Sequence, residues 1–210
     1  MSILALTSDT LTSPAAAGQI EYTSPIFAAT PVGTQRGIVP TQQYYRLDSN
    51  YAGSNATGAQ SLFGVGVTLS ASTVYEIETV FILSKSAGAT SHNISLSFAG
   101  TATLNNIVYL SFVNQSGSSS FVTGANSSAY TFTNNSASAN TLTIAAIASA
   151  ASSMYVVLKG TVSVNAGGTF IPQYTLSAAP GGAYSTYAGS YIKINPLSAS
   201  GAATNVGAWA

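Results

Sequence analysis

The feature that most constrains the fold is an alternation of side-chain type that recurs along the chain. Between Val74 and Leu83, every second residue suits a buried face, and these residues are Tyr75, Ile77, Thr79, Phe81 and Leu83. Successive side chains of a β-strand point to opposite faces, so a period of two places such a set on one side of a sheet. The same period recurs at residues 156–164, 94–98 and 192–194. We therefore predict a strand with one apolar face at each of these places.

Further candidate strands occupy the chain after residue 41. They are 44–48, 61–69, 107–113, 130–133, 141–147 and 169–176, with turn-rich connectors such as 85–90, 114–120 and 179–182 between them. The segment 144–154 also fits a helix, but it lacks charged caps and i,i+4 pairs, so we interpret it as strand. Short strands with regularly spaced turns indicate a sandwich or a barrel. We predict an all-β fold, a jelly-roll-like antiparallel β-sandwich, over residues 42–210.

Residues 1–41 differ in composition from the rest of the chain. Four of the seven prolines lie there, and these are Pro14, Pro25, Pro31 and Pro40. Proline fixes φ and has no amide donor, which argues against a helix or a central strand. We predict an extended attachment arm over residues 1–41, in which 19–22 and 26–28 are short enough to add as strands to another surface.

Charged side chains are scarce. Five Lys and Arg and five Asp and Glu make up 5% of the 210 residues and cancel to a net charge of zero, where about 25% charged residues is usual. Acid–base, metal and phosphate chemistry needs charged side chains or histidine, and the chain has one histidine. We therefore predict a structural or binding protein and not an enzyme, with no cofactor and no metal site.

The same composition limits the partners that we expect. The chain has no cysteine and no cluster of Lys or Arg, so we predict neither disulfides nor a nucleic-acid partner. The longest run of small apolar residues, 143–151, is shorter than the roughly 18 residues of a membrane span, so we predict no membrane insertion. The first residues lack a basic segment, and we expect no secretory signal.

The edges of the predicted sheets have little protection. Soluble proteins commonly guard edge strands with lysine or proline, and the lysines of this chain are Lys85, Lys159 and Lys193. A neutral surface with poorly guarded edges suits a protein that packs against its own copies. We predict a homo-oligomer.

Two carboxylates raise the question of catalysis. Glu76 and Glu78 share one strand face, about 7 Å apart by the strand rise, a separation compatible with an inverting glycosidase. Such an enzyme also needs a cleft with aromatic and polar groups that hold a sugar. We prefer the interpretation that the pair is a solvent-facing stripe, neutralised by Lys159 on a neighbouring strand.

Three other motifs are weaker. His92 lies in a turn that enters a strand, and no Gly-x-Ser-x-Gly elbow accompanies it, so we interpret it as a polar turn residue. The segment 48–53 begins like a calcium loop, but Ala52 and Ala59 stand where further oxygen ligands belong, which favours a simple turn. Gly64 and Gly66 lack the third glycine and the helix of a dinucleotide fingerprint, and indicate a bulge or a close backbone contact.

Tyrosines gather near the loop 178–182. They are Tyr174, Tyr184, Tyr187 and Tyr191, and with Trp209 they form our candidate contact set. Exposed tyrosines can stack on sugars, and they are also enriched at subunit interfaces. We favour an interface because the low charge already points to assembly, and keep a host-surface glycan as the alternative partner.

Two stretches resemble structural proteins of tailed bacteriophages. The first is Ala-Gly-Gln-Ile-Glu-Tyr at 17–22, Phe-Ala-Ala-Thr-Pro at 27–31 and Arg-Gly-Ile-Val-Pro at 36–40. The second comprises Gly-Thr-Phe-Ile-Pro-Gln-Tyr at 168–174, Ser-Ala-Ala-Pro-Gly-Gly at 177–182 and Asn-Val-Gly-Ala-Trp at 205–209. Together they cover about a third of the chain. Head fibres, decoration proteins, collar appendages and tail fibres share motifs of this kind.

The resemblance implies a homotrimeric capsid decoration or head-fibre protein, assembled in the bacterial cytoplasm and exposed on the virion surface. The alternative is a tail-fibre-type module that binds a receptor or a glycan. The resemblance further implies that the arm binds the major capsid protein or another virion protein, through Glu21, Tyr22, Phe27, Pro31, Arg36 and Pro40. For Glu21 and Arg36, we expect a pair with each other or with the capsid protein.

Overall fold

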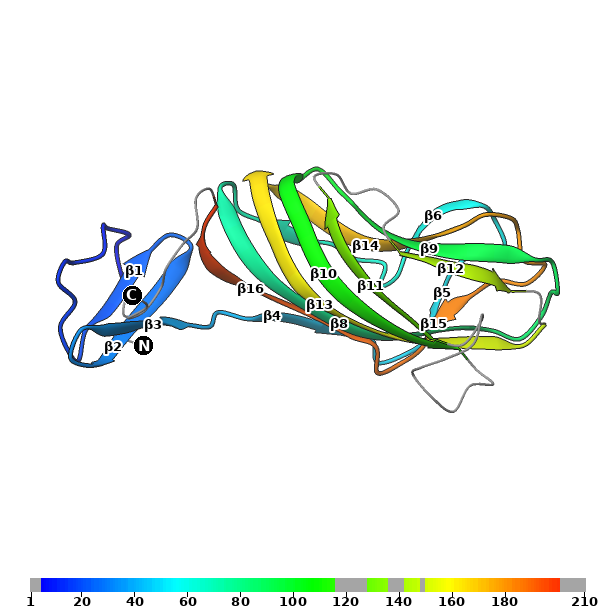
Figure 1. The fold of residues 1–210 in the computed structure, drawn as a ribbon, viewed down its shortest axis with the longest axis horizontal. Helices are drawn as coiled ribbons and strands as arrows, with labels where there is room; N and C mark the ends of the chain where they lie inside the picture. Colours follow the sequence, from blue (N-terminus) through cyan, green and yellow to red (C-terminus); the bar gives the residue numbers. More distant parts are fainter. Residues whose placement is uncertain (1–4, 116–127, 136–141, 148–149, 201–210) are drawn as a thin grey trace.

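The computed structural model describes residues 5–115, 128–135, 142–147 and 150–200, and all the regular structure in these ranges is β-strand. Within them the strands form three antiparallel sheets, of which the two larger ones pack together as a sandwich (Figure 1). The predicted all-β sandwich is confirmed, while its jelly-roll connectivity stays a prediction. None of these ranges contains a helix that could cross a membrane.

The large sheet has the order β11–β10–β13–β8. Beyond β8 it continues with β16 and then β4, while the end of β8 pairs with β15, which in turn pairs with β5. The strand bounds are β4 Gln43–Arg46, β5 Tyr51–Ala52, β8 Thr73–Lys85, β10 Thr103–Gln115, β11 Ser128–Asn135, β13 Ser152–Ala166, β15 Ser185–Thr186 and β16 Tyr191–Ala199. Three of these strands, β8, β10 and β13, are at least 13 residues long and lie next to one another in the sheet.

The second sheet has the order β12–β9–β14–β6, and β7 also pairs with β14. Its strands are β6 Gly58–Ser61, β7 Val67–Leu69, β9 His92–Ala99, β12 Leu142–Ile147 and β14 Gly168–Leu176. In the predicted strand 144–154, residues 144–147 end β12 and residues 152–154 begin β13, so the choice of strand over helix is confirmed for these residues.

The predicted continuous strand at 61–69 is wrong, because residues 62–66 leave the sheet between β6 and β7. Gly64 has a φ of 71°, a conformation that favours glycine. A Cβ atom at this position would lie 2.5 Å from a ring carbon of Tyr51. The glycine pair that we interpreted as a bulge or close contact thus marks a loop packed against a tyrosine.

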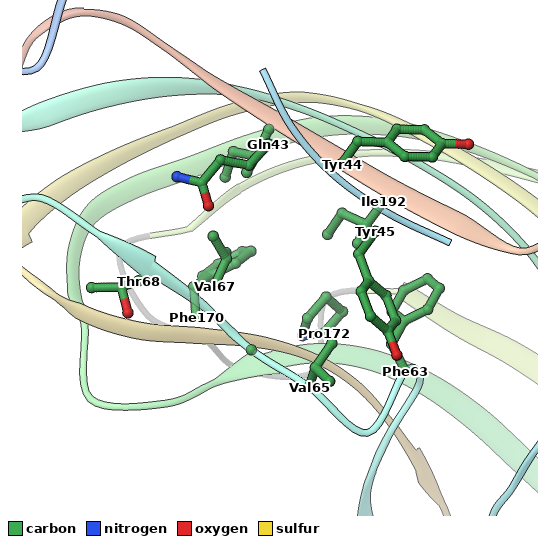
Figure 2. A pocket seen from close by; sticks show the side chains of 12 residues that line it. Gln43, Tyr44, Tyr45, Phe63, Val65, Val67, Thr68, Phe170, Pro172 and Ile192 are labelled. Carbon is green, nitrogen blue, oxygen red and sulfur yellow. The ribbon is translucent and has the colours of Figure 1, made fainter. Parts of the chain in front are cut away.

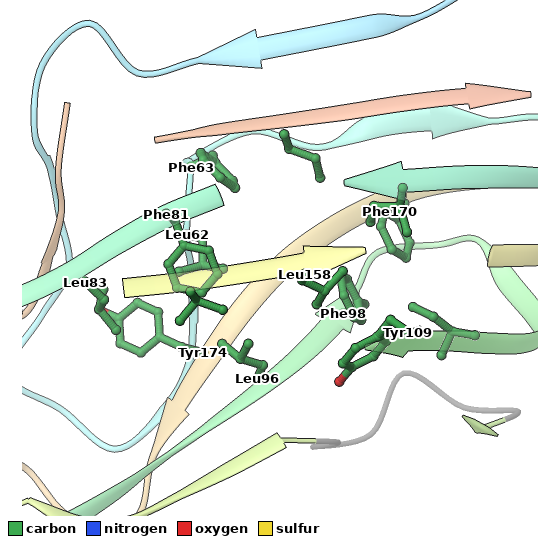
Figure 3. Packing of buried hydrophobic residues seen from close by; sticks show 14 of the residues in the cluster. Leu62, Phe63, Phe81, Leu83, Leu96, Phe98, Tyr109, Leu158, Phe170 and Tyr174 are labelled. Atoms are coloured by element: carbon green, nitrogen blue, oxygen red, sulfur yellow. The ribbon is translucent and has the colours of Figure 1, made fainter. Parts of the chain in front are cut away.

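The core lies between the two larger sheets and uses the faces that the alternation predicted. On β8, Ile77, Phe81 and Leu83 are each no more than 1% exposed. From the second sheet, the Phe98 ring stacks on Phe170 and meets Tyr109 of the large sheet edge-on at 5.9 Å (Figure 3). Apolar burial of this extent is the main favourable contribution to folding.

The prediction of an extended arm over residues 1–41 does not hold for residues 20–39. These residues fold into a third sheet, made of β1 Ile20–Thr23, β2 Ile26–Val32 and β3 Gln35–Val39, which lies at one end of the molecule (Figure 1), while residues 5–19 contain no helix or strand. Residues 40–42 have no regular structure and lead from this N-terminal sheet into β4. The prolines misled the prediction because they lie where a sheet tolerates them: Pro25 is in the β1–β2 turn and Pro40 follows β3.

Pro31 lies within the central strand β2, which the proline rule argued against. The pairing of β1 with β2 runs from Thr23–Ile26 to Ile20–Ala29 and ends before Pro31. The pairing of β2 with β3 breaks between Ala29 and Val32. Proline is therefore tolerated here because the ladder is interrupted on both sides of it.

Candidate binding surfaces

One face of the N-terminal sheet is closed by an ion pair. Arg36 Nε lies 2.8 Å from Glu21 Oε2, and the two side chains are 18% and 13% exposed. The Thr12 amide donates to Glu21 Oε1 at 2.7 Å, and Arg36 Nη2 donates to the Thr12 carbonyl at 2.6 Å. Hydrogen bonds from the Thr12 side chain and amide, together with Arg36, lower the pKa of Glu21. The two charges thus pair with each other, and they fasten the preceding loop to the sheet.

The opposite face of the N-terminal sheet is apolar and open. Tyr22, Phe27 and Val39 stand side by side in register, and the Tyr22 and Phe27 rings stack at 4.5 Å. Ile20, two residues before Tyr22, is 67% exposed, and Val39 is 41% exposed. We call Ile20, Tyr22, Phe27 and Val39 the N-terminal apolar face. It contains two of the predicted attachment residues, Tyr22 and Phe27, while Pro31, near the end of β2, and Pro40, after β3, are exposed.

Two of the candidate tyrosines belong to the core, so their assignment as surface contacts was wrong. Tyr174 is 1% exposed and Tyr184 is fully buried. The Tyr174 hydroxyl donates to Gln60 Oε1 at 2.9 Å, and the Tyr184 hydroxyl lies 2.8 Å from His92 Nε2. Burial raises the pKa of Tyr174 to about 12 and raises that of Tyr184 as well. The sequence held a signal for Tyr174, which alternates with the buried residues Phe170 and Leu176 on β14.

His92 is also buried, and its interpretation as a polar turn residue needs correction. It is the first residue of β9 and is 2% exposed. Its Nδ1 lies 2.7 Å from the Thr90 carbonyl oxygen, while Nε2 faces the Tyr184 hydroxyl. Both ring nitrogens therefore have partners, and the imidazole connects the start of β9 to the buried Tyr184.

The other candidate tyrosines lie at or near the surface. Tyr187 is 40% exposed. Tyr191 donates its hydroxyl to Glu78 Oε1 at 3.0 Å and stacks on Tyr44, with the ring centroids 5.4 Å apart. Trp209 lies outside the described residues. Of the four tyrosines in the set, Tyr187 and Tyr191 are thus the two that can contribute to a surface contact.

The carboxylate stripe forms a charge ladder across the outer face of the large sheet. Lys159 and Lys193 stand directly opposite Glu78 on the two flanking strands, with N–O distances of 3.3 and 2.9 Å. The hydrogen bond from Lys193 is the main cause that lowers the pKa of Glu78. The neutralisation by Lys159 is confirmed, and Lys193 adds a second cation. A glycosidase acid needs a raised pKa, so Glu78 is tuned in the opposite direction.

In the segment 48–53, a bend at residues 48–49 leads into the short strand β5, so the predicted turn is confirmed for the first part of the segment. Asp48 forms an ion pair with Arg46, and the Asn50 side chain accepts a hydrogen bond from the Ala188 amide at 2.9 Å. Within the part of the chain that the structure describes, no group of three or more His, Cys, Asp or Glu residues could hold a metal ion.

A large apolar surface lies beside the charge ladder. Phe112 on β10, Val157 on β13 and Val80 on β8 form one row across three strands. Phe112 is 43% exposed and Val157 is 39% exposed. The neighbouring rows add Leu110 and Tyr155, which are 36% and 50% exposed. We call Val80, Leu110, Phe112, Tyr155 and Val157 the outer apolar face. Exposed apolar groups that are contiguous, and not scattered singly, mark a surface that binds another macromolecule.

Comparison with known proteins adds little. No protein-family model matches the chain, and no curated protein matches it. Among solved structures, a chain from the structure of infectious bursal disease virus, Gx strain, is 8% identical, with 83% of this chain and 47% of that chain covered and a TM-score of 0.19. This chain thus spans about half the length of that viral chain, and at such a TM-score the likeness supports no inference about fold or function.

Proposed function

We propose that the protein is a structural component of a tailed bacteriophage virion, a homotrimeric decoration or head-fibre protein on the particle surface. The observation that carries the proposal is the outer apolar face. A soluble monomer of zero net charge that exposed such a face would associate with its copies. The motifs at 17–40 and 168–182 resemble those of phage virion proteins, and from this resemblance we infer that the assembly is a virion.

The outer apolar face is part of a larger surface, the outer side of the large sheet, which is large enough to join copies of the chain. At the usual strand spacing and rise, the long strands β10, β13 and β8 cover about 14 Å by about 43 Å, and the shorter β16 adds about 5 Å by about 30 Å, which together make roughly 750 Å². A standard interface buries about 800 Å² on each partner. The row of Glu78 between two lysines gives this surface a fixed register, because a facing copy must match its charges.

We assign attachment to the N-terminal apolar face instead of an extended arm. Glu21 and Arg36 satisfy each other, so the groups of this sheet that remain to bind a virion protein are the apolar ones. Burial of Ile20 and Val39 against a capsid protein would supply binding without any charge.

This attachment can be tested on particles. In particles assembled with the double variant Ile20→Asp, Val39→Asp, we expect at least about a tenfold loss of bound protein, because each aspartate places a charge in an apolar contact. Val65→Asp is the control, since Val65 has nearly the same exposure as Val39 but lies on the sandwich, between β6 and β7. Quantitative mass spectrometry of purified particles gives the occupancy. Full occupancy of the double variant would contradict the proposal that this face attaches the protein to the virion.

The copy number from the same measurement separates the positions on the virion. Hundreds of copies per particle support a decoration protein, and a few dozen or fewer support a tail or vertex fibre. The alternative function, a receptor- or glycan-binding module, is favoured by the stacked pair Tyr44 and Tyr191, because Tyr44 is 54% exposed and offers a ring to a sugar. Binding to a glycan array that is lost in Tyr44→Ala would support this alternative.

A further inference from the structure

A pocket of about 400 Å³ opens at one side of the sandwich, between β4 of the large sheet and the segment 63–68 beside the second sheet (Figure 2). Its walls are mainly apolar and include Tyr45, Phe63, Val65, Phe170 and Ile192. No residue that lines it is charged, and the polar side chains on its inner side are those of Gln43, Tyr45 and Thr68. The pocket therefore suits an uncharged, apolar group.

The strand that borders the pocket has one paired edge. In the described ranges, β4 pairs with β16 and with no other strand, and all four of its residues are exposed. The backbone groups along its other edge are available to a further strand, as at any sheet edge. Among the residues of β4, Arg46 carries a charge, and it stands opposite Tyr191 on the outer side of the sheet.

Some inward-facing side chains of the sandwich line this pocket, and there they are exposed to solvent. Tyr45 stands opposite Ile192 in the strand register, so it belongs to the inward-facing row. Ile192 is 8% exposed, yet Tyr45 is 39% exposed. Its ring meets Phe63 edge-on, with the centroids 6.3 Å apart (Figure 2). Val65, on the opposite side of the pocket, is also 39% exposed.

We propose that β4 and this pocket bind an extended, uncharged segment of a partner protein. The segment adds to the large sheet as a strand beside β4 and places one apolar side chain in the pocket. Main-chain hydrogen bonds to an edge strand supply affinity in this mode of recognition, and a pocket for alternate side chains supplies specificity. A sugar fits less well, because it needs several convergent hydrogen-bonding groups and the walls are mostly apolar. This inference is independent of the virion role.

Synthetic strands provide the test. The probes are acetylated and amidated peptides Thr-Val-Thr-X-Thr-Val-Thr, with Leu or Ala at X, and a Leu peptide that is N-methylated at alternate residues so that it cannot pair with an edge. We expect the Leu peptide to bind about tenfold or more tightly than the Ala peptide, because its side chain is buried. We expect the N-methylated peptide to lose binding. Amide chemical shifts from NMR should change along β4 and at the pocket walls.

A matched pair of variants locates the site. Val65→Arg puts a charge at the pocket and should weaken the Leu peptide at least about tenfold. Leu6→Arg is the control, because Leu6 has the same 39% exposure but lies in the N-terminal segment that precedes β1. Equal affinity for the Leu and Ala peptides, unchanged binding of the N-methylated peptide, or shift changes away from β4 would each overturn the proposal. Sugar binding that Val65→Arg abolishes, with no peptide binding, would overturn it as well.

Discussion

Replacing Phe81 with alanine is expected to lower the free energy of unfolding by about 3–5 kcal/mol, the usual cost of truncating a buried phenylalanine. Phe81 is 1% exposed and lies on the inner face of β8. The same replacement at Phe112, which is 43% exposed on the outer face of β10, is expected to cost less than about 1 kcal/mol for the separate chain. The two variants remove identical atoms, so their difference reports the face on which each ring lies.

Urea unfolding at several protein concentrations measures both effects. The loss in Phe81→Ala should be the same at every concentration, because the ring is buried within one chain. The decrease in the free energy of unfolding caused by Phe112→Ala should grow with protein concentration. Association stabilises the folded state of the unmodified chain by mass action, and this variant weakens that association. Equal losses in the two variants would contradict the assignment of inner and outer faces.

Replacing Lys85 with methionine is expected to lower the free energy of unfolding by about 2–4 kcal/mol. Lys85 ends β8 and is 4% exposed. Its Nζ donates to the carbonyl oxygens of Gly88, Ala87 and Ala150, the last two at 3.4 and 3.3 Å. Methionine fills similar space but supplies no donor, so these part-buried carbonyl oxygens lose a charged hydrogen-bond partner.

The control for this variant is Lys159→Met, on the outer face. Lys159 is 62% exposed and pairs with Glu78, which keeps Lys193 as a partner, so we expect a loss below about 1 kcal/mol. Thermal unfolding followed by circular dichroism compares the two variants. If the Lys85→Met protein is as stable as the unmodified chain, the lysine does not stabilise the contact between the loop after β8 and the residues just before β13.

The inner faces of the sandwich could be predicted because alternation is a local property. The inward rows of β8 and β13 follow from a period of two in the sequence alone, without knowledge of which strands pair. The run 107–113 held a further signal. Leu110 and Phe112 are apolar at outward positions, and a strand that is apolar on both faces indicates that both faces are covered.

The errors arose where pairing between distant residues decides the outcome. Residues 20–39 can form a sheet despite Pro31, because this proline lies at a break in the strand pairing. The position of such a break is not a local property of the sequence. Tyr184 was assigned to the surface because it follows a glycine-rich loop. Its burial depends on His92, which reaches its hydroxyl from 92 residues away in the chain. The pairing of Lys193 with Glu78 likewise depends on the register of β16 against β8.

The most direct test of the account is the mass of the isolated chain in solution, measured by light scattering at micromolar concentration. The outer apolar face predicts an assembly, and the proposed trimer has three times the chain mass of 21.2 kDa. A stable species of 21.2 kDa at every concentration up to tens of micromolar would show that this face needs no partner copy, and would contradict the central claim.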